Sequence, residues 1–249
     1  MFRTAIITGG SKGIGWELVQ LFAHSGYHVL SGSRTITEKI PSDIRENVRQ
    51  VVIDTKVRDD HKKLVNTAIS WTGRVDAYIN NAGYSEWRAL QDIDESFLKN
   101  IFETNLYGYF YGAQAAASII ESGGSILNIS SIAGKRGSLN NSAYSATKFG
   151  VTALTQSLCK ELGPQGIRVN AVCPVLIETP GLMSALNSKS SPAQGNSDKF
   201  LQNFSMGQTA LGRLPTIKEV ADLALFLCSE SASGITGQSI NIDCGVLPN

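Results

Sequence analysis

The chain has 249 residues, of which 42% are hydrophobic, and its formal net charge at pH 7 is +1. This length suits one α/β domain with a single core. The near-neutral charge gives no general attraction to nucleic acid or to an anionic membrane, and no apolar stretch is long enough to span a bilayer. The first apolar run begins at residue 3 and leaves no room for a signal peptide, so we expect a cytoplasmic protein.

The cysteines are dispersed, they form no C-x-x-C pair, and the chain has only three histidines. This spacing predicts neither a zinc site nor a disulfide framework, so we expect no metal site. We interpret the four cysteines as small buried hydrophobes, namely Cys159, Cys173, Cys228 and Cys244.

The chain opens with the short apolar run 3–8, which is typical of a strand buried on both faces. Next come the glycine-rich stretch Gly9-Gly10-Ser11-Lys12-Gly13-Ile14-Gly15 and a helix-like pattern over 14–25. Strand, glycine loop and helix in this order place a pyrophosphate at a helix N-terminus. A tight turn without a ligand is the alternative interpretation.

Strand-like runs and helical patterns alternate along the whole chain. The strands are expected at 3–8, 27–31, 50–54, 75–79, 125–130, 167–172 and 239–242. The helices are expected at 14–25, 58–72, 96–121, 142–162 and 218–229. The alternation predicts a single-domain α/β fold, a doubly wound parallel sheet (Rossmann fold) with helices on both faces.

Two segments depart from this alternation. The crossover 35–49 holds Pro41 and few apolar residues, and we expect only a short or broken helix there. The segment 186–198 is rich in Ser, Asn, Pro and Gly, and we expect a loop. It follows the sixth strand, where ligands bind in such sheets, so a substrate lid at about 180–207 is expected.

Tyr144 and Lys148 lie four residues apart in the expected helix 142–162, and they therefore share one face. An ammonium there would favour the phenolate and lower the pKa of Tyr144 from its ordinary value of about 10. A tyrosine so tuned can act as a general acid/base on a carbonyl oxygen, which the hydroxyl of Ser131 could also hold. The alternatives are chance spacing and a surface Tyr packed under a Lys stem.

Five motifs in order resemble the short-chain dehydrogenase/reductase family, and the resemblance covers essentially the whole chain, 1–249. They are the loop Thr8-Gly9-Gly10-Ser11-Lys12-Gly13-Ile14-Gly15, the stretch Asn80-Asn81-Ala82-Gly83, Asn105, the set Ser131, Tyr144 and Lys148, and the closing run Thr236-Gly237-Gln238-Ser239-Ile240-Asn241-Ile242-Asp243. The sequence is most similar to the 3-oxoacyl-carrier-protein reductase type. The resemblance implies an enzyme that interconverts a carbonyl and a secondary alcohol by hydride transfer.

The resemblance implies four catalytic residues. Tyr144 would donate the proton, Lys148 would lower its pKa and hold the nicotinamide ribose, Ser131 would steady the carbonyl oxygen, and Asn105 would hold a water for proton resupply. A buried Asn bonded to its own helix backbone is the alternative for Asn105. The expected cofactor-binding residues are Gly9, Ser11, Lys12, Gly13, Ile14, Gly15, Ser33, Arg34, Asp54, Asn81, Ala82, Gly83, Tyr144, Lys148, Pro174, Ile177 and Thr179.

The end of the second strand bears on the choice of cofactor. Proteins that use NAD carry an Asp or Glu there, whereas this chain has Ser33 followed by Arg34. Arg34 and Lys12 would bind a 2′-phosphate, so we predict NADP(H). Solvated surface charges are the alternative. Asp54 is expected near the adenine, with a helix-capping role as the alternative.

The sequence departs from the family pattern at two positions, where Val175 and Cys244 replace common glycines. A β-branched Val resists positive φ, so the loop that carries Thr179 is expected to sit differently. Cys244 is expected to affect packing. The substrate pocket is expected between 84–87, 132–140 and the lid, with an apolar flank that admits acyl chains, steroids or other ring ketones.

The stretch 106–117 carries aromatic or small residues on every side, and a helix of this kind is buried all round. The helix of Tyr144 has the same excess. We therefore predict a homotetramer formed through the helices around Asn105 and Tyr144, as the resemblance also implies. For function, the alternatives to an oxoacyl reductase are a reductase of another small ketone (sugar, steroid or polyol) and a non-catalytic NADP-sensing protein.

Overall fold

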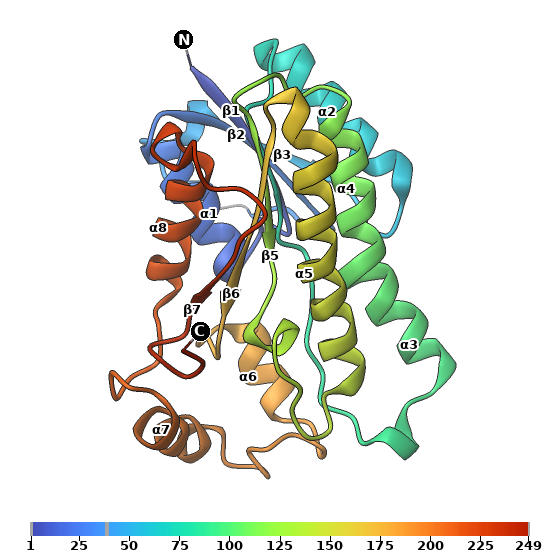
Figure 1. Cartoon of the computed structure of the whole chain (residues 1–249), viewed down its shortest axis with the longest axis vertical. Coiled ribbons are helices and arrows are strands. Elements are labelled where there is room, and N and C mark those ends of the chain that lie inside the picture. The colour runs from blue at the N-terminus through green and yellow to red at the C-terminus, as the bar shows by residue number, and fades with distance from the viewer. Residues whose placement is uncertain (1, 38–39, 249) are drawn as a thin grey trace.

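The computed structural model describes residues 2–37 and 40–248, and its centre is one sheet of parallel strands in the order β3-β2-β1-β4-β5-β6-β7 (Figure 1). The strands are β1 Arg3–Thr8, β2 Tyr27–Ser33, β3 Val48–Val52, β4 Ala77–Asn80, β5 Ser125–Ile129, β6 Arg168–Pro174 and β7 Ser239–Ile242. Every residue of β4, β5 and β6 is buried. Parallel strands must be covered on both faces, which is why these runs are almost continuously apolar.

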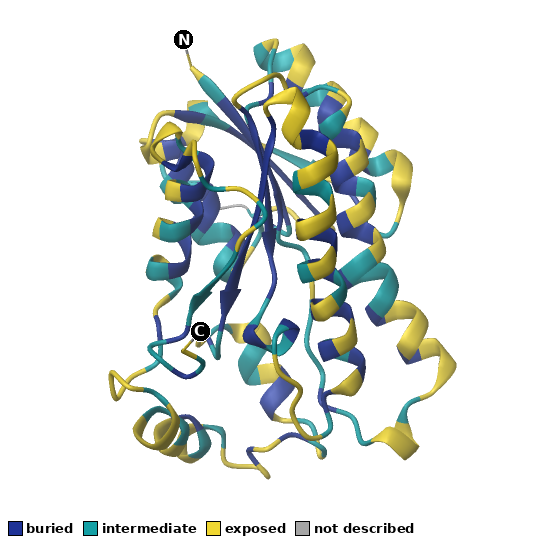
Figure 2. Cartoon of the chain, viewed as in Figure 1, coloured by how far each residue is buried: buried dark blue, intermediate teal, exposed yellow. Residues whose placement is uncertain are grey.

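Helices cover both faces of the sheet, as predicted (Figures 1 and 2). On one face, α1 (Gly13–His24) packs against α8 (Ile217–Cys228), and Phe22 and Leu227 are among the fully buried side chains there. The helices of the other face are α2 (Arg58–Thr72), α4 (Gly108–Ala117) and α5 (Ser142–Leu162). Each face therefore has its own apolar core, and the doubly wound prediction is confirmed.

The order of the strands reverses at β1, which pairs with β2 on one side and with β4 on the other. Ligands of open α/β sheets bind at the carboxyl ends of the strands beside such a switch point. The stretch 9–12 follows β1 there, and the stretch 81–83 follows β4. The fold thus brings two of the sequence motifs to one edge of the sheet.

One predicted helix, 96–121, is divided in the structure. It consists of α3 (Glu95–Phe102), a π-helical turn (Glu103–Tyr107) and α4. A π turn inserts an extra residue into the helical ladder and often marks a functional site. Here it contains Asn105, whose side chain bonds outside its own helix.

Residues 187–196 form a loop, in agreement with the loop expected at 186–198, and two helices that were not predicted lie on either side of it. They are α6 (Pro180–Leu186) and α7 (Ser197–Gln208), which lie beyond the carboxyl ends of the strands (Figure 1). Thr179 and Asn196 cap them by accepting bonds from the amides of Leu182 and Lys199. The capping residues Thr179 and Asn196, together with Pro180 at the first helical position, are the sequence features that indicate where these helices begin.

Smaller differences concern boundaries and the second crossover. Strand β3 begins two residues earlier than the predicted 50–54. In the crossover 35–49, the described residues form one short 3-10 turn, Arg45–Asn47, in agreement with a short or broken helix, while residues 38–39 lie outside the described part. No helix in the described ranges is long and apolar enough to cross a bilayer.

Candidate active site

The glycine loop turns sharply and packs tightly against its neighbours. Gly9 has φ +71°, a left-handed conformation that favours glycine, and an added Cβ there would lie 2.9 Å from Cα of Ala82. A Cβ on Gly15 would collide with the carbonyl of Gly9. The backbone of the loop therefore lies against the stretch 81–83, as expected for two halves of one binding site.

Asn81 fixes the glycine loop to the end of β4. Its Nδ2 donates to the carbonyls of Thr8 at 2.9 Å and Gly9 at 3.3 Å, and its amide donates to Oγ1 of Thr8 at 3.0 Å. Beside it, Asn80 ties strands together through a bond from its Nδ2 to Oδ1 of Asn128 at 3.0 Å. The amide side chain of Asn81 thus shapes the loop, and contact with a cofactor at 81–83 remains a prediction.

The end of β2 folds over the glycine loop. Thr37 Oγ1 donates to the carbonyl of Ser11 at 2.7 Å, and Ser33 Oγ donates to the carbonyl of Thr35 at 2.5 Å. Lys12 and Arg34 are exposed on either side of this contact, and within 2–37 and 40–248 neither has an ion-pair partner. Among the described residues, two exposed cations without an ion-pair partner thus lie next in sequence to Ser11 and Ser33 of this polar contact.

Asp54 follows β3, and its side chain accepts a bond from the amide of Lys56 at 3.0 Å. The next helix, α2, has Val57 at its N-cap, so the helix-capping alternative for Asp54 is wrong. Its place near an adenine remains a prediction.

Ser131, Tyr144 and Lys148 come together at the carboxyl end of β5. Ser131 begins a 3-10 turn by accepting a bond from the amide of Ala133 at 3.1 Å, and its hydroxyl donates to the carbonyl of Pro174 at 3.4 Å. The same hydroxyl interacts with the partly exposed Tyr144 and lowers the pKa of that phenol. Lys148 follows one turn later on α5 and is 4% exposed. The sequence motif therefore forms one cluster.

The ammonium of Lys148 lies inside the molecule between two aromatic rings. Nζ donates to the carbonyl of Ile129 at 2.8 Å and lies 3.5 Å from Oη of Tyr109. The ring centroids of Tyr109 and Tyr144 are 5.2 and 5.7 Å away. Both rings are within the range of a cation–π contact.

The pKa values correct one sequence expectation. Burial raises the pKa of Tyr144 to about 12, although the bond to Ser131 acts in the opposite direction. Burial also lowers the pKa of Lys148 to about 8. The pKa of Tyr144 in the chain by itself therefore lies above its ordinary value and not below it as predicted, because desolvation dominates and Nζ of Lys148 bonds Ile129. That Lys148 favours the phenolate during catalysis stays a prediction. At neutral pH Tyr144 is a neutral phenol, the form that donates a proton.

Asn105 is fully buried beside this cluster. Its Oδ1 accepts from the amide of Tyr84 at 3.0 Å, and its Nδ2 donates to the carbonyl of Tyr84 at 2.8 Å and to Oγ1 of Thr147 at 3.4 Å. The alternative of a bond to its own helix backbone is therefore wrong. Asn105 fixes the chain after β4 to helix α5, and its role with a water remains a prediction.

The segment after β6 returns to the glycine loop. A Cβ on Gly13 would lie 3.5 Å from Cγ2 of Thr179, while Oγ1 of Thr179 caps α6. Val175 is absent from the positive-φ residues of the described chain, so its β-branched side chain meets no such strain, and a different position of the Thr179 loop stays a prediction. Cys244 does adopt φ +54°, and its carbonyl accepts from the amide of Ala210 at 2.8 Å.

Helices α6 and α7 enclose an apolar cluster at the rim of the site. Its buried members are Trp87, Ala185, Leu186, Ala193 and Leu201. The segment 180–207 is also bonded to the rim, since Oγ of Ser188 donates to the carbonyl of Trp87 at 3.2 Å and Nδ2 of Asn140 donates to the carbonyl of Ser190 at 3.0 Å. The bonds of Asn140 and Ser188 could not be predicted from the sequence, because their partners are backbone atoms far along the chain.

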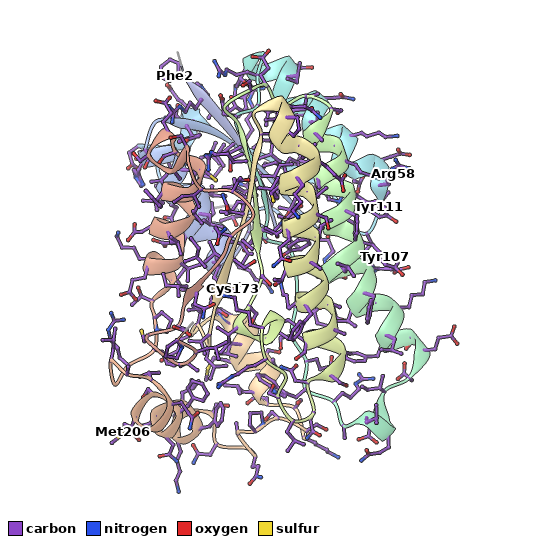
Figure 3. The ribbon with its side chains drawn as sticks, viewed as in Figure 1. Phe2, Arg58, Tyr107, Tyr111, Cys173 and Met206 are labelled. Carbon is purple, nitrogen blue, oxygen red and sulfur yellow. The ribbon has the colours of Figure 1, made fainter. Side chains whose placement is uncertain are left out.

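No group of three or more His, Cys, Asp or Glu side chains that could hold a metal ion occurs among the described residues. All four cysteines are free. Cys173, from β6, lies near the centre of the molecule in Figure 3, and its buried thiol interacts with Ser130 and Lys148. Burial raises the pKa of this thiol, so it is uncharged at neutral pH.

Comparison with known proteins agrees with this geometry. Residues 9–247 match a family model described as enoyl-(acyl carrier protein) reductase. The 3-oxoacyl-[acyl-carrier-protein] reductase of Thermotoga maritima is 33% identical over 98% of this chain and 98% of its own length. The trans-4-hydroxycyclohexanecarboxylate dehydrogenase of Sinomonas cyclohexanicum is 33% identical over 98% of this chain and 92% of its own.

Among solved structures, a variant of the actinorhodin polyketide ketoreductase with NADPH superposes with a TM-score of 0.88. It is 28% identical, and the match covers 98% of this chain and 97% of the ketoreductase. The chain belongs to the short-chain dehydrogenase/reductase family of oxidoreductases, which use nicotinamide cofactors. Within it, the chain resembles the 3-oxoacyl-acyl-carrier-protein reductase type.

Proposed function

We propose that this protein is an NADP(H)-dependent oxidoreductase that interconverts a carbonyl and a secondary alcohol, with Tyr144 as the general acid/base. One observation carries the proposal. Tyr144, which interacts with Ser131, stands one helical turn from the buried Lys148, at the sheet edge that also holds the glycine loop.

The residues at this edge fit a nicotinamide dinucleotide. Glycines occupy the positions of the stretch 9–15 where the backbone contacts its neighbours most closely, and helix α1 begins within this stretch. Lys12 and Arg34 supply cations for a 2′-phosphate, and Thr179 lies beside Gly13 for the nicotinamide end. The cofactor would supply the hydride, and the protein would supply position and the proton.

The roles of the catalytic side chains follow from their protonation. The neutral phenol of Tyr144 donates its proton to the carbonyl oxygen during reduction, and Ser131 holds the same oxygen through its hydroxyl. Lys148 favours the phenolate that is left, because a positive charge stabilises a nearby negative one. Asn105 keeps Tyr84 and α5 in register and, as proposed, holds the water that returns the proton.

A 3-oxoacyl thioester is the proposed substrate class. The partly buried apolar side chains beside the apolar cluster of α6 and α7, among them Leu182, Met183 and Phe200, suit contact with an acyl chain, and we assign a lid function to 180–207. The relatives named above include a 3-oxoacyl-[acyl-carrier-protein] reductase, which supports this choice. A small ring ketone is the second candidate, because another relative is a dehydrogenase of trans-4-hydroxycyclohexanecarboxylate.

Incubation of the purified protein with NADPH and a carbonyl panel, followed by nicotinamide absorbance, tests the proposal. The panel contains 3-oxoacyl thioesters of increasing chain length, cyclic ketones, steroids, sugars and polyol-derived ketones. We expect turnover of at least one class, with NADPH preferred over NADH. Tight NADPH binding without turnover of any carbonyl would instead indicate a non-catalytic NADP-sensing protein.

We also propose a homotetramer formed through the helices around Asn105 and Tyr144, in a cytoplasmic protein. Apolar side chains lie exposed on the outer faces of these helices, with Tyr107 at 46%, Phe110 at 43% and Phe149 at 45% (Figures 2 and 3). Burial of such a face against a second copy would be favourable, and closed symmetry is the usual result.

Light scattering distinguishes the assemblies, because one chain has a mass of 26.7 kDa and four have four times 26.7, about 107 kDa. Phe110→Glu should lower the mass, whereas Ile69→Glu, at an exposed position of α2, should not. A wild-type mass of a single chain would contradict the proposal.

A further inference from the structure

Tyr109 is a buried tyrosine that contacts Lys148 from a neighbouring helix, whereas Tyr144 shares helix α5 with Lys148. Tyr109 comes from α4 and is 1% exposed. Its Oη donates to the carbonyl of Ile129 at 2.8 Å, and that carbonyl also accepts from Nζ of Lys148 at 2.8 Å. The two donors are 3.5 Å apart, so three polar groups meet at one point.

Rigid elements hold Tyr109 in this position. Its ring packs against Val151 and Leu154 of α5, and its backbone carbonyl accepts a bond from Nδ2 of Asn80 at 3.4 Å. A buried hydroxyl has to be hydrogen-bonded to avoid a large desolvation cost, and here its bond goes to the carbonyl that anchors the lysine. The sequence motifs gave no indication of this residue.

An ammonium has three N–H donors and no acceptor. In the described surroundings of Lys148, one donor reaches Ile129, and the oxygen of Tyr109 is the second oxygen within reach. Because the Tyr109 proton is directed to Ile129, its lone pairs remain available to the ammonium. The face of the Tyr109 ring adds a further attraction for the cation.

We propose that Tyr109 is a positioning residue for Lys148. The hydroxyl and the ring of Tyr109 hold the charged ammonium of Lys148 at the Ile129 carbonyl. Its consequence for catalysis rests on the function proposed above. The hydroxyl anchors and does not relay, since its bond ends at a carbonyl that cannot pass a proton on. Burial also raises the pKa of Tyr109, which keeps it a neutral phenol.

The titratable groups that face Lys148 come from three elements. They are Tyr109 on α4, Tyr144 on its own helix and Cys173 on β6. Burial raises the pKa of each of these three groups, Cys173 and Lys148 influence each other's charge, and both Tyr109→Phe and Tyr78→Phe keep Cys173 and Tyr144 in place. A change in the Lys148 titration on removal of the Tyr109 hydroxyl therefore reports on that oxygen.

The experiment compares Tyr109→Phe with Tyr78→Phe. Tyr78 is also fully buried, and its hydroxyl is 2.8 Å from Nδ1 of His61 on α2, so this control loses an equivalent buried bond elsewhere. Protein labelled with 13C at lysine Cε is titrated by NMR from pH 6 to 11, and the Lys148 signal is assigned by its loss in Lys148→Met. The alkaline limb of kcat is measured in parallel.

We expect Tyr109→Phe to move the Lys148 midpoint down by about half a pH unit or more, since a buried ammonium loses an oxygen neighbour. The alkaline limb of kcat should move with it, whereas Tyr78→Phe should change neither. An unchanged midpoint in Tyr109→Phe would overturn the inference, whatever happens to stability. A shifted midpoint with an unchanged kcat limb would overturn its catalytic part.

The NMR titration needs neither cofactor nor substrate. Failure of the proposed function appears separately, as wild-type protein that turns over no carbonyl while its Lys148 midpoint still responds to Tyr109→Phe. That result would support the anchoring contact and remove its connection to reduction.

Discussion

Two cationic regions of this molecule have opposite surroundings. Lys148 is 4% exposed, touches the Ile129 carbonyl and lies between two aromatic rings. Lys12 lies exposed in the glycine loop after β1, and Arg34 lies exposed directly after β2. In the buried region desolvation decides the protonation state, whereas in the exposed region solvent and salt set the strength of any interaction.

The comparison indicates a division of labour. A buried ammonium acts over a short distance in a low-dielectric space, so it can influence the chemistry of Tyr144 and depends on pH. Exposed cations suit cofactor selection, because they attract a cofactor that carries a 2′-phosphate more strongly than one that lacks it and do not contact the reacting atoms. Each prediction below tests one side of this contrast.

The largest expected effect is at Tyr144. Tyr144→Phe removes the proton donor and leaves the ring in place, so turnover should fall by at least ~10²-fold with NADPH binding retained. Steady-state kinetics and cofactor fluorescence measure the two quantities. A variant with more than a tenth of the wild-type rate would show that the buried region does not perform the chemistry.

A second prediction concerns the cost of burying Lys148. Its pKa falls from 10.5 in its ordinary state to about 8 in the folded protein. The unfolded chain binds more protons between these values, so this group makes stability rise with pH across that window. The difference corresponds to about 3 kcal/mol at pH 7, an order-of-magnitude figure.

Lys148→Met should therefore abolish activity and still raise the free energy of unfolding at pH 7 by about 1–3 kcal/mol. The Ile129 carbonyl keeps its bond from Tyr109 in this variant. The gain should shrink as pH rises from about 8 to 10.5 and disappear above that value, where the lysine is unprotonated in the folded and the unfolded chain alike. Urea titrations at several pH values measure it, and Lys160→Met, at an exposed position of α5, is the control. Destabilisation at pH 7 would contradict the argument.

The exposed region is tested by Arg34→Asp. A carboxylate there would repel a 2′-phosphate and accept bonds from a ribose hydroxyl, so the preference for NADPH over NADH should fall by ~10-fold or more, with kcat little changed. Ratios of kcat/KM for the two cofactors measure it. Arg45→Asp makes the same change in net charge nearby and should leave the ratio unaltered. A wild-type protein that already prefers NADH would refute the cofactor assignment.

The alternation of patterns was sufficient to predict the sheet and most helices. The helix predicted at 142–162 is Ser142–Leu162 in the structure, because its helical period is sustained over five turns or more. The division of 96–121 was not predicted, since a π turn leaves the apolar pattern intact. Helices α6 and α7, on either side of the predicted loop 186–198, were missed because α6 has only seven residues and α7 mixes apolar with polar residues, so that their caps are the clearest signal.

In the site, the motifs predicted which residues meet but not how they interact. Ser131, Tyr144 and Lys148 do form one cluster. The direction of the Tyr144 pKa shift could not be predicted, because desolvation depends on packing from several elements. Tyr109 escaped notice for the same reason, since its partner is the main-chain carbonyl of Ile129, 20 residues away, to which no local pattern points.

The smallest expected effect is one of salt. Raising the ionic strength from about 0.1 to about 1 M shortens the screening length from about 10 to about 3 Å. Exposed cations such as Lys12 and Arg34 should then lose part of their attraction for a phosphate, and the NADPH preference should fall about threefold. The alkaline limb of kcat, set by Lys148 near pH 8, should stay in place because its ammonium is buried and salt screens buried charges much less than exposed ones. If instead the limb moves while the cofactor preference stays constant, the assignments of the two regions have to be exchanged.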